Sequence, residues 1–437
     1  MRFPTAPSSK SQASSRPPGV DQLQWRSDAS QAGARPAASQ KAAPAAVEQT
    51  PRGRWPGLRP WVRRMGRAIF VVVYTAIFLE CFIRVFTPAL IMPRYVIDAP
   101  YGIRVNEPSR SFWHQTPEYR IEIRTNSKGV RCDREIPYEK PEGTFRIVSL
   151  GDSYTVGYGV SVEDLWLTQM ENELRASGIN CEVVNLGVSG HSTSEELIHL
   201  KEEGLKYHPD LVLVGWNHLD LSRNVRADLF RLGKDGLVRG SPSYLPAVSI
   251  SRFLFTFGAY RFLAENSHLY CKVRETASDI VIDLMDTLHR LRTRVARWSR
   301  AFSAAAAASR SASRSDGDYE EKLAIALLAE MAKISRQNGA SLVVLDIPVV
   351  VRDGDRRTMA SRFPRCDGFR VDIYCPAAEL SRHPVEATHW TKSCGHWTPL
   401  GCSIVGRGLA KHILSDSHVR IEQATTGESR ATGRSGL

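Results

Sequence analysis

The sequence predicts an α/β fold, a three-layer α/β/α sandwich whose central sheet is mostly parallel. Short apolar runs rich in β-branched residues predict buried strands at residues 145–150, 181–185, 211–216 and 341–347. Segments of helical character lie between these runs, at residues 162–176, 193–207 and 320–337. Buried strands that alternate with helices are typical of a parallel sheet covered on both faces.

Each predicted element has its own signal. The four strand sequences are FRIVSL, CEVVN, LVLVGW and SLVVLDI, and their nearly continuous apolar character indicates burial on both faces of the sheet. The last helix has the clearest spacing, since its apolar residues recur in helical register at Leu323, Ala324, Leu327, Leu328 and Met331. We place this domain at residues 145–415, after an N-terminal extension at 100–144.

The basic excess of the chain belongs to its N-terminal tail. The net charge is +12 over 437 residues, yet residues 1–67 carry 12 Lys or Arg against 3 Asp or Glu. Residues 1–60 are rich in Ala, Pro, Ser and Arg without an apolar period, so we predict a disordered tail there and a second one at 416–437. With so little net charge on the rest, we predict no nucleic-acid partner.

One segment is apolar enough to cross a membrane. Residues 68–79 are uncharged, and the apolar character continues past Glu80 and Arg84, which lie one helical turn apart and are expected to pair. We predict a transmembrane anchor at residues 65–92; the alternative is a buried helix of a soluble domain. A cleaved signal peptide fits less well, because the apolar run begins too late in the chain.

Six arginines precede this segment and few positive charges follow it. The positive-inside rule then predicts a single-pass protein of the inner (cytoplasmic) membrane, with a cytoplasmic N-terminus and an extracytoplasmic, periplasmic domain. Such a compartment permits disulfides among the eight cysteines, and the pairs closest in sequence are Cys366 with Cys375 and Cys394 with Cys402. Seven cysteines follow the anchor, so at least one is expected to be unpaired in a monomer.

Residues 220–318 interrupt the alternation of strands and helices. This stretch is rich in aromatic residues and arginine, and it ends in the low-complexity sequence AFSAAAAASRSASRSDGD. We predict a helical insertion followed by a flexible connector. The insertion could form a lid over the site or a platform on the membrane surface, and the sequence leaves both open.

Polar groups follow three of the predicted strands. Gly-Asp-Ser at 151–153 follows the first, Gly-Val-Ser-Gly at 187–190 the second, and Asn217 the third. The carboxyl ends of parallel strands lie at one edge of the sheet, where loops and helix N-termini converge. A serine at a helix start there presents its hydroxyl beside unpaired backbone N–H groups.

These segments carry a resemblance to a known family. The sequences VSLGDSYTVG, VVNLGVSGHST, VLVGWNHLD and GHWTPLGCSIVGRGLAKHI resemble, in order, the four motif blocks of the SGNH or GDSL serine esterases and acyltransferases, whose fold is flavodoxin-like. Residues 125–147, between a membrane segment and the Gly-Asp-Ser, further resemble the membrane-anchored bacterial members. The similarity is good over 125–220 and looser over 319–413.

The resemblance implies a role for each matching residue. Ser153 would be the nucleophile and His396 the base that carries its proton. The oxyanion would be held by the backbone N–H groups of Ser153 and Gly190 and by the Asn217 amide. Asp152 and Asn185 would support the site by hydrogen bonding.

The chain departs from the family where the acid of the triad is expected. The family places Asp two or three residues before the histidine, and this chain has Ser393 and Cys394 there. Three alternatives follow: a backbone carbonyl accepts the proton on His396 Nδ1, a distant carboxylate such as Glu386 or Asp372 substitutes, or the site no longer catalyses. His218 is a smaller departure, since the family often has Asp there.

We predict no cofactor and no metal. His383, His389, Cys394 and His396 are spaced too irregularly for a zinc motif, and no phosphate-binding or dinucleotide fingerprint is present. The expected partners are an acylated carbohydrate or a small ester and, through one helix, the membrane. The activity would be ester hydrolysis or acyl transfer, and the alternative is a carbohydrate-binding or assembly module with a degenerate triad.

Overall fold

The computed structural model describes residues 58–88, 91, 95–234, 236–242, 253–254, 256–277, 280, 284, 287, 315–353, 356–364, 371–393 and 395–415. The predicted tails at 1–60 and 416–437 lie outside this part, apart from residues 58–60. Cys366 and Cys394 also lie outside it, so each of the two cysteine pairs suggested by the sequence has one member outside the described residues.

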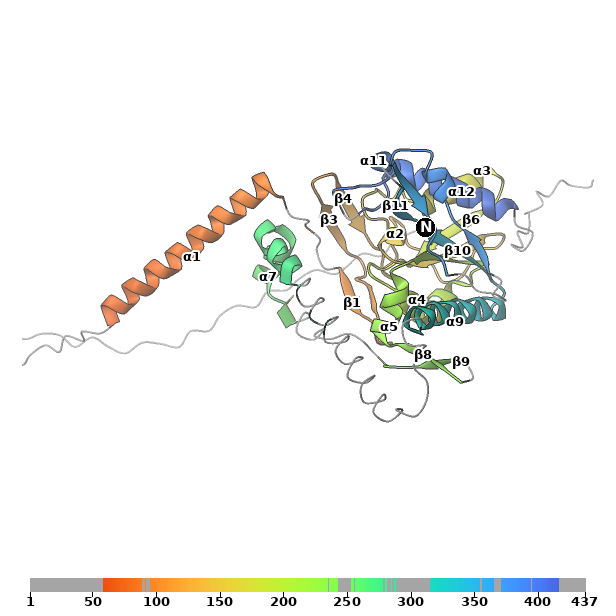
Figure 1. Cartoon of the computed structure of the whole chain (residues 1–437), viewed down its shortest axis with the longest axis horizontal. Coiled ribbons are helices and arrows are strands. Elements are labelled where there is room, and N and C mark those ends of the chain that lie inside the picture. Colours follow the sequence, from red (N-terminus) through yellow and green to blue (C-terminus); the bar gives the residue numbers. More distant parts are fainter. Residues whose placement is uncertain are drawn as a thin grey trace, which may run out of the picture. The chain divides into compact units, whose positions relative to one another are not determined.

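A parallel sheet forms the centre of the domain, as predicted, and it contains one strand more than the four that the sequence indicated (Figure 1). Its strand order is β13-β10-β7-β5-β6. The strands are β5 (Phe145–Gly151), β6 (Cys181–Asn185), β7 (Leu211–Asn217), β10 (Ser341–Ile347) and β13 (Asp372–Tyr374). Every residue of β5 and β7 is buried, which explains their continuous apolar sequences.

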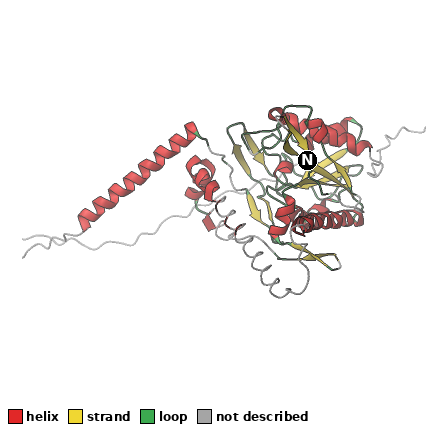
Figure 2. Ribbon diagram, viewed as in Figure 1, coloured by secondary structure: helices red, strands yellow, loops and turns green. Residues whose placement is uncertain are grey.

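Helices cover both faces of the sheet (Figure 2). On one face α3 (Trp166–Ala176) packs against α12 (Pro399–Ser415). On the other face α9 (Ser315–Gln337) contacts both α4 (Thr193–Glu202) and α5 (Asp220–Ala227). Two separate apolar cores result, and alternate residues of β5 serve them: Val148 and Leu150 in one, Phe145 and Ile147 in the other.

Successive strands are added on opposite sides of β5 in the sheet. From β5 the chain adds β6 on one side and then crosses to β7 on the other. In open parallel sheets such a change of side leaves a crevice at the carboxyl ends of the strands. The residue pair Asp152 and Ser153, directly after β5, lies at that point.

A glycine allows α12 to approach α3 closely. A Cβ atom on Gly406 would lie 2.3 Å from the carbonyl oxygen of Trp166. Because α12 begins three residues after His396, this contact also determines where the histidine lies relative to the sheet. The remaining short helices are α2 (Ser153–Val156), η1 (Gly204–Tyr207), α10 (Ala377–Leu380) and α11 (Val385–Thr388).

The N-terminal extension contains two antiparallel hairpins that the sequence analysis did not predict. They are β1 (Val96–Asp98) with β2 (Arg104–Asn106), and β3 (Ser111–Gln115) with β4 (Arg120–Arg124). A third unpredicted hairpin follows β10, formed by β11 (Val349–Asp353) and β12 (Arg356–Ala360).

The insertion is not helical throughout. After α5 the chain forms the hairpin of β8 (Phe230–Gly233) and β9 (Gly236–Arg239), so the helical prediction is wrong there. The reason is local: Gly236, at φ +120°, permits a tight turn between the two strands. Helix α7 (Gly258–Asn266) and the helical residues 268–277 follow, while most of 278–314 lies outside the described residues.

Helix α1 (Leu58–Phe86) precedes the hairpins. Within the described ranges it is the one helix long and apolar enough to cross a membrane, over Pro60–Phe86, and that stretch is exposed. The expected pair of Glu80 and Arg84 is present, with 2.6 Å between Oε1 and Nε.

Candidate active site

The residues after β5 form a tight corner. Asp152 caps the short helix α2, and its Oδ1 accepts a hydrogen bond from the backbone N–H of Tyr154 at 2.9 Å. Gly157 ends the helix with φ +83°, a left-handed conformation in which a Cβ would collide with Leu165. Ser153 therefore lies at the first position of a helix, where backbone N–H groups have no helical partner.

Ser153 and His396 meet at this corner although 243 residues separate them in sequence. The distance between Ser153 Oγ and His396 Nε2 is 2.7 Å. The turn that carries the histidine is closed by hydrogen bonds from Trp390 N to the His396 carbonyl, at 2.8 Å, and from Gly395 N to the Trp390 carbonyl, at 3.0 Å. Tyr154 attaches this turn to α2, because its hydroxyl donates to the Gly395 carbonyl at 3.0 Å.

The surroundings of His396 keep its imidazole neutral. The residue is 7% exposed, and burial lowers its pKa to about 4, with a smaller contribution from His389. A neutral imidazole can accept a proton, whereas the charged form cannot. At neutral pH, Nε2 is therefore able to accept the Ser153 hydroxyl proton.

The other predicted residues gather around the same strand ends. The Asn217 side-chain amide donates to Asp152 Oδ2 at 3.2 Å, so the end of β7 contacts the serine corner directly. The Asn185 amide donates to the Thr155 carbonyl at 2.9 Å and joins the end of β6 to α2. Gly190 lies in the loop after β6 with φ +76°, and its carbonyl oxygen accepts a hydrogen bond from Arg104 Nη2 at 3.0 Å.

Two of the three candidate oxyanion donors are available, whereas the Asn217 amide already uses one N–H on Asp152 and has only its second N–H left to donate. Within the part of the chain that the structure describes, the backbone N–H groups of Ser153 and Gly190 donate to no protein acceptor. Gly190 carries no side chain to obstruct the approach of a substrate carbonyl. Both groups thus meet a requirement of oxyanion stabilisation, which is that the donor is not already engaged in the resting protein.

Buried carboxyl groups lie beside the corner, and the sequence analysis missed most of them. Burial raises the pKa of Asp152, against which Arg223 and the Tyr154 N–H act in the opposite direction. Burial and neighbouring carboxylates also raise the pKa of Glu196 and Asp220, both almost fully buried. Burial first, and the like charge of the neighbouring carboxylates second, thus favour the protonated forms of Glu196 and Asp220.

The acid of a triad is absent from the described geometry. His396 Nδ1 and the Ser393 hydroxyl are both buried, and neither has a hydrogen-bond partner among the described residues. Cys394 lies outside those residues. Glu386 is paired with Arg357 at 3.1 Å and Asp372 with His412 at 2.7 Å, so the two carboxylates weighed as substitutes are engaged elsewhere.

The histidines near His396 have other neighbours in the structure. In the described ranges, no three His, Cys, Asp or Glu side chains are grouped as ligands. His389 instead has its Nδ1 2.9 Å from the Thr388 hydroxyl, and burial lowers its pKa to about 4.

Arg131 is a further residue that supports the corner. It is 1% exposed, and its guanidinium donates to the carbonyls of Val156 and Gly157 and, at 2.7 Å, to that of Val160. These carbonyls belong to the loop that follows Ser153. An arginine in an extension was not expected to be buried, because the charged side chain is normally exposed.

Replacing Arg131 by Met is expected to destabilise the domain strongly. Three buried carbonyls would lose their donors, and each unsatisfied group costs about 1–3 kcal/mol, so we expect a loss of roughly 3 kcal/mol or more. The measurement is thermal unfolding of the full chain in detergent. Arg131→Lys keeps the charge but has fewer donors, so its thermal stability should lie between those of the wild type and the Met variant. A Met variant as stable as the wild type would contradict this role.

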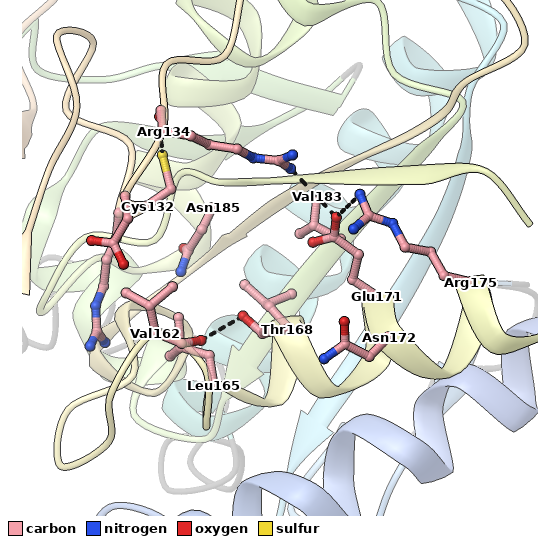
Figure 3. A pocket seen from close by; sticks show the side chains of 13 residues that line it. Cys132, Arg134, Val162, Leu165, Thr168, Glu171, Asn172, Arg175, Val183 and Asn185 are labelled. Carbon is pink, nitrogen blue, oxygen red and sulfur yellow. Dashed lines mark hydrogen bonds and ion pairs between the residues drawn. The ribbon is translucent and has the colours of Figure 1, made fainter.

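A cavity of about 260 Å³ lies beside α3 and is separate from the serine (Figure 3). Its walls include Arg131, Arg134, Glu171 and Asn185, but neither Ser153 nor His396. Glu171 pairs there with Arg134 at 3.4 Å and with Arg175. Its charged groups therefore have partners within the protein.

The structure thus places the protein among α/β sandwiches that have a serine–histidine pair at the carboxyl edge of a parallel sheet. Residues 149–361 match the model of the GDSL-like Lipase/Acylhydrolase family. These residues, slightly less than half of the chain, are thus similar to a family of lipases and acylhydrolases.

Solved structures of low identity are also similar. TesA is 14% identical, with 47% of this chain and 62% of TesA covered and a TM-score of 0.24. The esterase EstA from Pseudoalteromonas sp. is 12% identical, with 62% of this chain and 97% of EstA covered and a TM-score of 0.32. A third structure, the acetylxylan esterase Axe2 from Geobacillus stearothermophilus, is 12% identical, with 61% of this chain and 93% of Axe2 covered and a TM-score of 0.30. The match thus spans about three fifths of TesA's length. No curated protein matches the sequence.

Proposed function

We propose that the protein is a membrane-anchored serine hydrolase that cleaves carboxylic esters through an acyl-serine intermediate. The observation that carries the proposal is the 2.7 Å contact between Ser153 Oγ and His396 Nε2. It joins a hydroxyl at a helix start to a neutral, buried imidazole, which is the pairing that activates a serine nucleophile.

The reaction has two steps. Ser153 Oγ attacks the ester carbonyl while His396 Nε2 takes its proton, and the Ser153 and Gly190 N–H groups with the Asn217 amide stabilise the oxyanion. The histidine then returns the proton to the departing alcohol, which leaves an acyl-serine. Water attacks this ester in the second step, giving a carboxylic acid and the free serine; a sugar hydroxyl as acceptor would give acyl transfer instead.

The catalytic unit is a dyad in this proposal. No acceptor for the proton on His396 Nδ1 lies among the described residues, so the imidazole is oriented by the turn of Trp390 and by the Tyr154 ring, whose centroid is 4.7 Å away. A dyad is slower than a triad, because no carboxylate stabilises the imidazolium that forms.

The preferred substrate is an O-acetyl ester of a cell-surface polysaccharide. This choice rests on the resemblance of residues 125–147 to the membrane-anchored members of the family. Turnover of aryl acetates with and without a sugar acceptor separates the outcomes. Release of acetate supports hydrolysis, acetylated sugar supports transfer, and well-folded protein that does neither supports a binding module.

Helix α1 is the proposed anchor, in the inner membrane with the N-terminus in the cytoplasm and the domain in the periplasm. The arginines before the apolar stretch support this orientation. An alkaline-phosphatase fusion after residue 92 should be active, because the enzyme folds only outside the cytoplasm. An inactive fusion would reverse the orientation.

The activity is expected to persist in moderately acidic solution. The lowered pKa of His396 keeps the imidazole neutral down to about pH 4, so the base form is lost as the pH falls through about 4 and not near 6.5. The measurement is kcat/KM for an aryl ester from pH 3.5 to 8, with circular dichroism to exclude unfolding. Half-maximal activity near pH 6.5 in folded protein would contradict the buried, neutral state.

A further inference from the structure

Two contacts attach α1 to the helical part of the insertion. The Glu80 carboxylate accepts hydrogen bonds from the backbone N–H groups of His268 and Leu269, at 3.0 and 2.8 Å, so it caps the helix over residues 268–277. Arg84 donates to the Asn266 carbonyl at 2.6 Å. Apolar packing of Ile83 with the same region supports the attachment.

The attachment lies near one end of α1. A helix of 27 residues is about 40 Å long, which matches a bilayer with its headgroups, and Glu80 lies six residues, about 9 Å, before Phe86. If α1 spans the membrane as proposed above, Glu80 lies about 11 Å from the bilayer midplane, so the helices that it holds lie close to the boundary between the hydrocarbon core and the headgroups.

The same helices expose an unusual number of large apolar side chains. We name as the aromatic face the residues Phe253, Phe257, Phe262, Leu263 and Val273, which are 47–65% exposed. The opposite side of α7 packs inward, with Ala264 fully buried. Phe253 and Phe257 are in ring contact, with 5.1 Å between their centroids, and so many exposed apolar side chains within one short segment indicate a surface that has a partner.

A neighbouring hairpin adds a tryptophan and an arginine to this region. A cavity of about 290 Å³ is lined by both α7 and the β3–β4 hairpin, through Glu265 on one side and Trp113 and Arg120 on the other. Trp113 is 48% exposed, and the Arg120 guanidinium lies 4.4 Å from its ring centroid. Tryptophan and arginine of this kind are enriched where proteins meet the bilayer interface.

We infer that the aromatic face, together with Trp113, docks on the membrane surface beside the point where α1 leaves the bilayer. The inference rests on the proposed anchoring of α1. We favour the bilayer as the partner of the aromatic face for two reasons. Helix α1 exposes its own apolar surface along its length, and Glu80 attaches the helices that carry the aromatic face to α1. The described helical part of the insertion, residues 256–277, would then serve as a platform on the membrane surface.

The test is photolabelling of the full chain in liposomes of phosphatidylethanolamine and phosphatidylglycerol that contain a diazirine lipid, followed by peptide mass spectrometry. We expect label in α1 and in residues 253–277, and none above background at Val238 and Val350, which are exposed apolar residues on other hairpins. Phe262→Ser with Leu263→Ser should lower the label in 253–277 at least fivefold and leave that in α1 unchanged. Val238→Ser is the matched control.

The outcomes separate this inference from the anchoring of α1. Label in α1 with only background in residues 253–277 overturns the platform and leaves the anchor in place. Cross-linking of the aromatic face to a second copy of the chain also overturns it. An unlabelled α1 removes the anchor and, with it, this inference.

Discussion

Ser153→Ala should reduce esterase activity by roughly four to six orders of magnitude, since the variant lacks the only atom that can form the acyl intermediate. The fold should be unaffected, because the change removes one hydroxyl from a half-buried position and leaves the Asp152 cap in place. The measurement is kcat/KM for an aryl acetate, together with covalent labelling by a fluorophosphonate, which should disappear.

The matched control is His396→Ala. If the two residues act as one unit, the double variant should be no slower than either single variant, because each already removes the reaction path. Ser153→Ala protein that keeps a tenth or more of the activity would show that another residue performs the chemistry. Labelling retained in that variant would lead to the same conclusion.

Ser393→Asp should increase activity at pH 7 by roughly tenfold to 10⁴-fold, the range set by the value of the acid in a serine triad. Ser393 and His396 Nδ1 are both buried and unpartnered in the described chain, three residues apart in one closed turn. A carboxylate there would stabilise the imidazolium and raise the pKa of His396 from about 4. The acid limb of the pH profile should therefore move to higher pH along with the gain in rate.

Ser393→Asn is the control, because it has nearly the same shape without the charge. The asparagine variant should show neither the gain nor the shift. An aspartate variant that folds, as judged by thermal unfolding, but has wild-type rate and pH profile would contradict the view that a missing carboxylate limits the dyad.

The strands of the central sheet could be predicted because burial on both faces gives them continuous apolar sequences. β13, with only three residues and an aspartate, lacks that signal, yet it pairs with β10 at the sheet edge. The β3 strand misleads for a physical reason: its histidine, His114, is fully buried, whereas its tryptophan, Trp113, is half exposed. A pattern based on hydrophobicity assigns these two residues to the wrong faces.

Some residues of the candidate site could be predicted from the sequence, and others could not. Ser153, Gly190, Asn217 and His396 were predicted from motif positions and the resemblance, and the structure places the serine and histidine in hydrogen-bond contact. Arg131 could not be predicted, because a buried arginine satisfied by carbonyls is indistinguishable in sequence from an exposed one. The sequence showed that the usual aspartate is missing, but only the coordinates show that Asp372 is already paired with a histidine of α12.

Arg131 lies outside the sheet-forming domain as the sequence divides the chain, yet its guanidinium is built into the loop behind the nucleophile. The segment between α1 and β5 is for that reason not a spacer that can be trimmed or exchanged. A soluble version cut immediately before residue 145 would retain every motif of the family and still lack a structural part of its reactive corner. A soluble fragment that keeps the surroundings of Ser153 intact therefore has to begin upstream of the first hairpin.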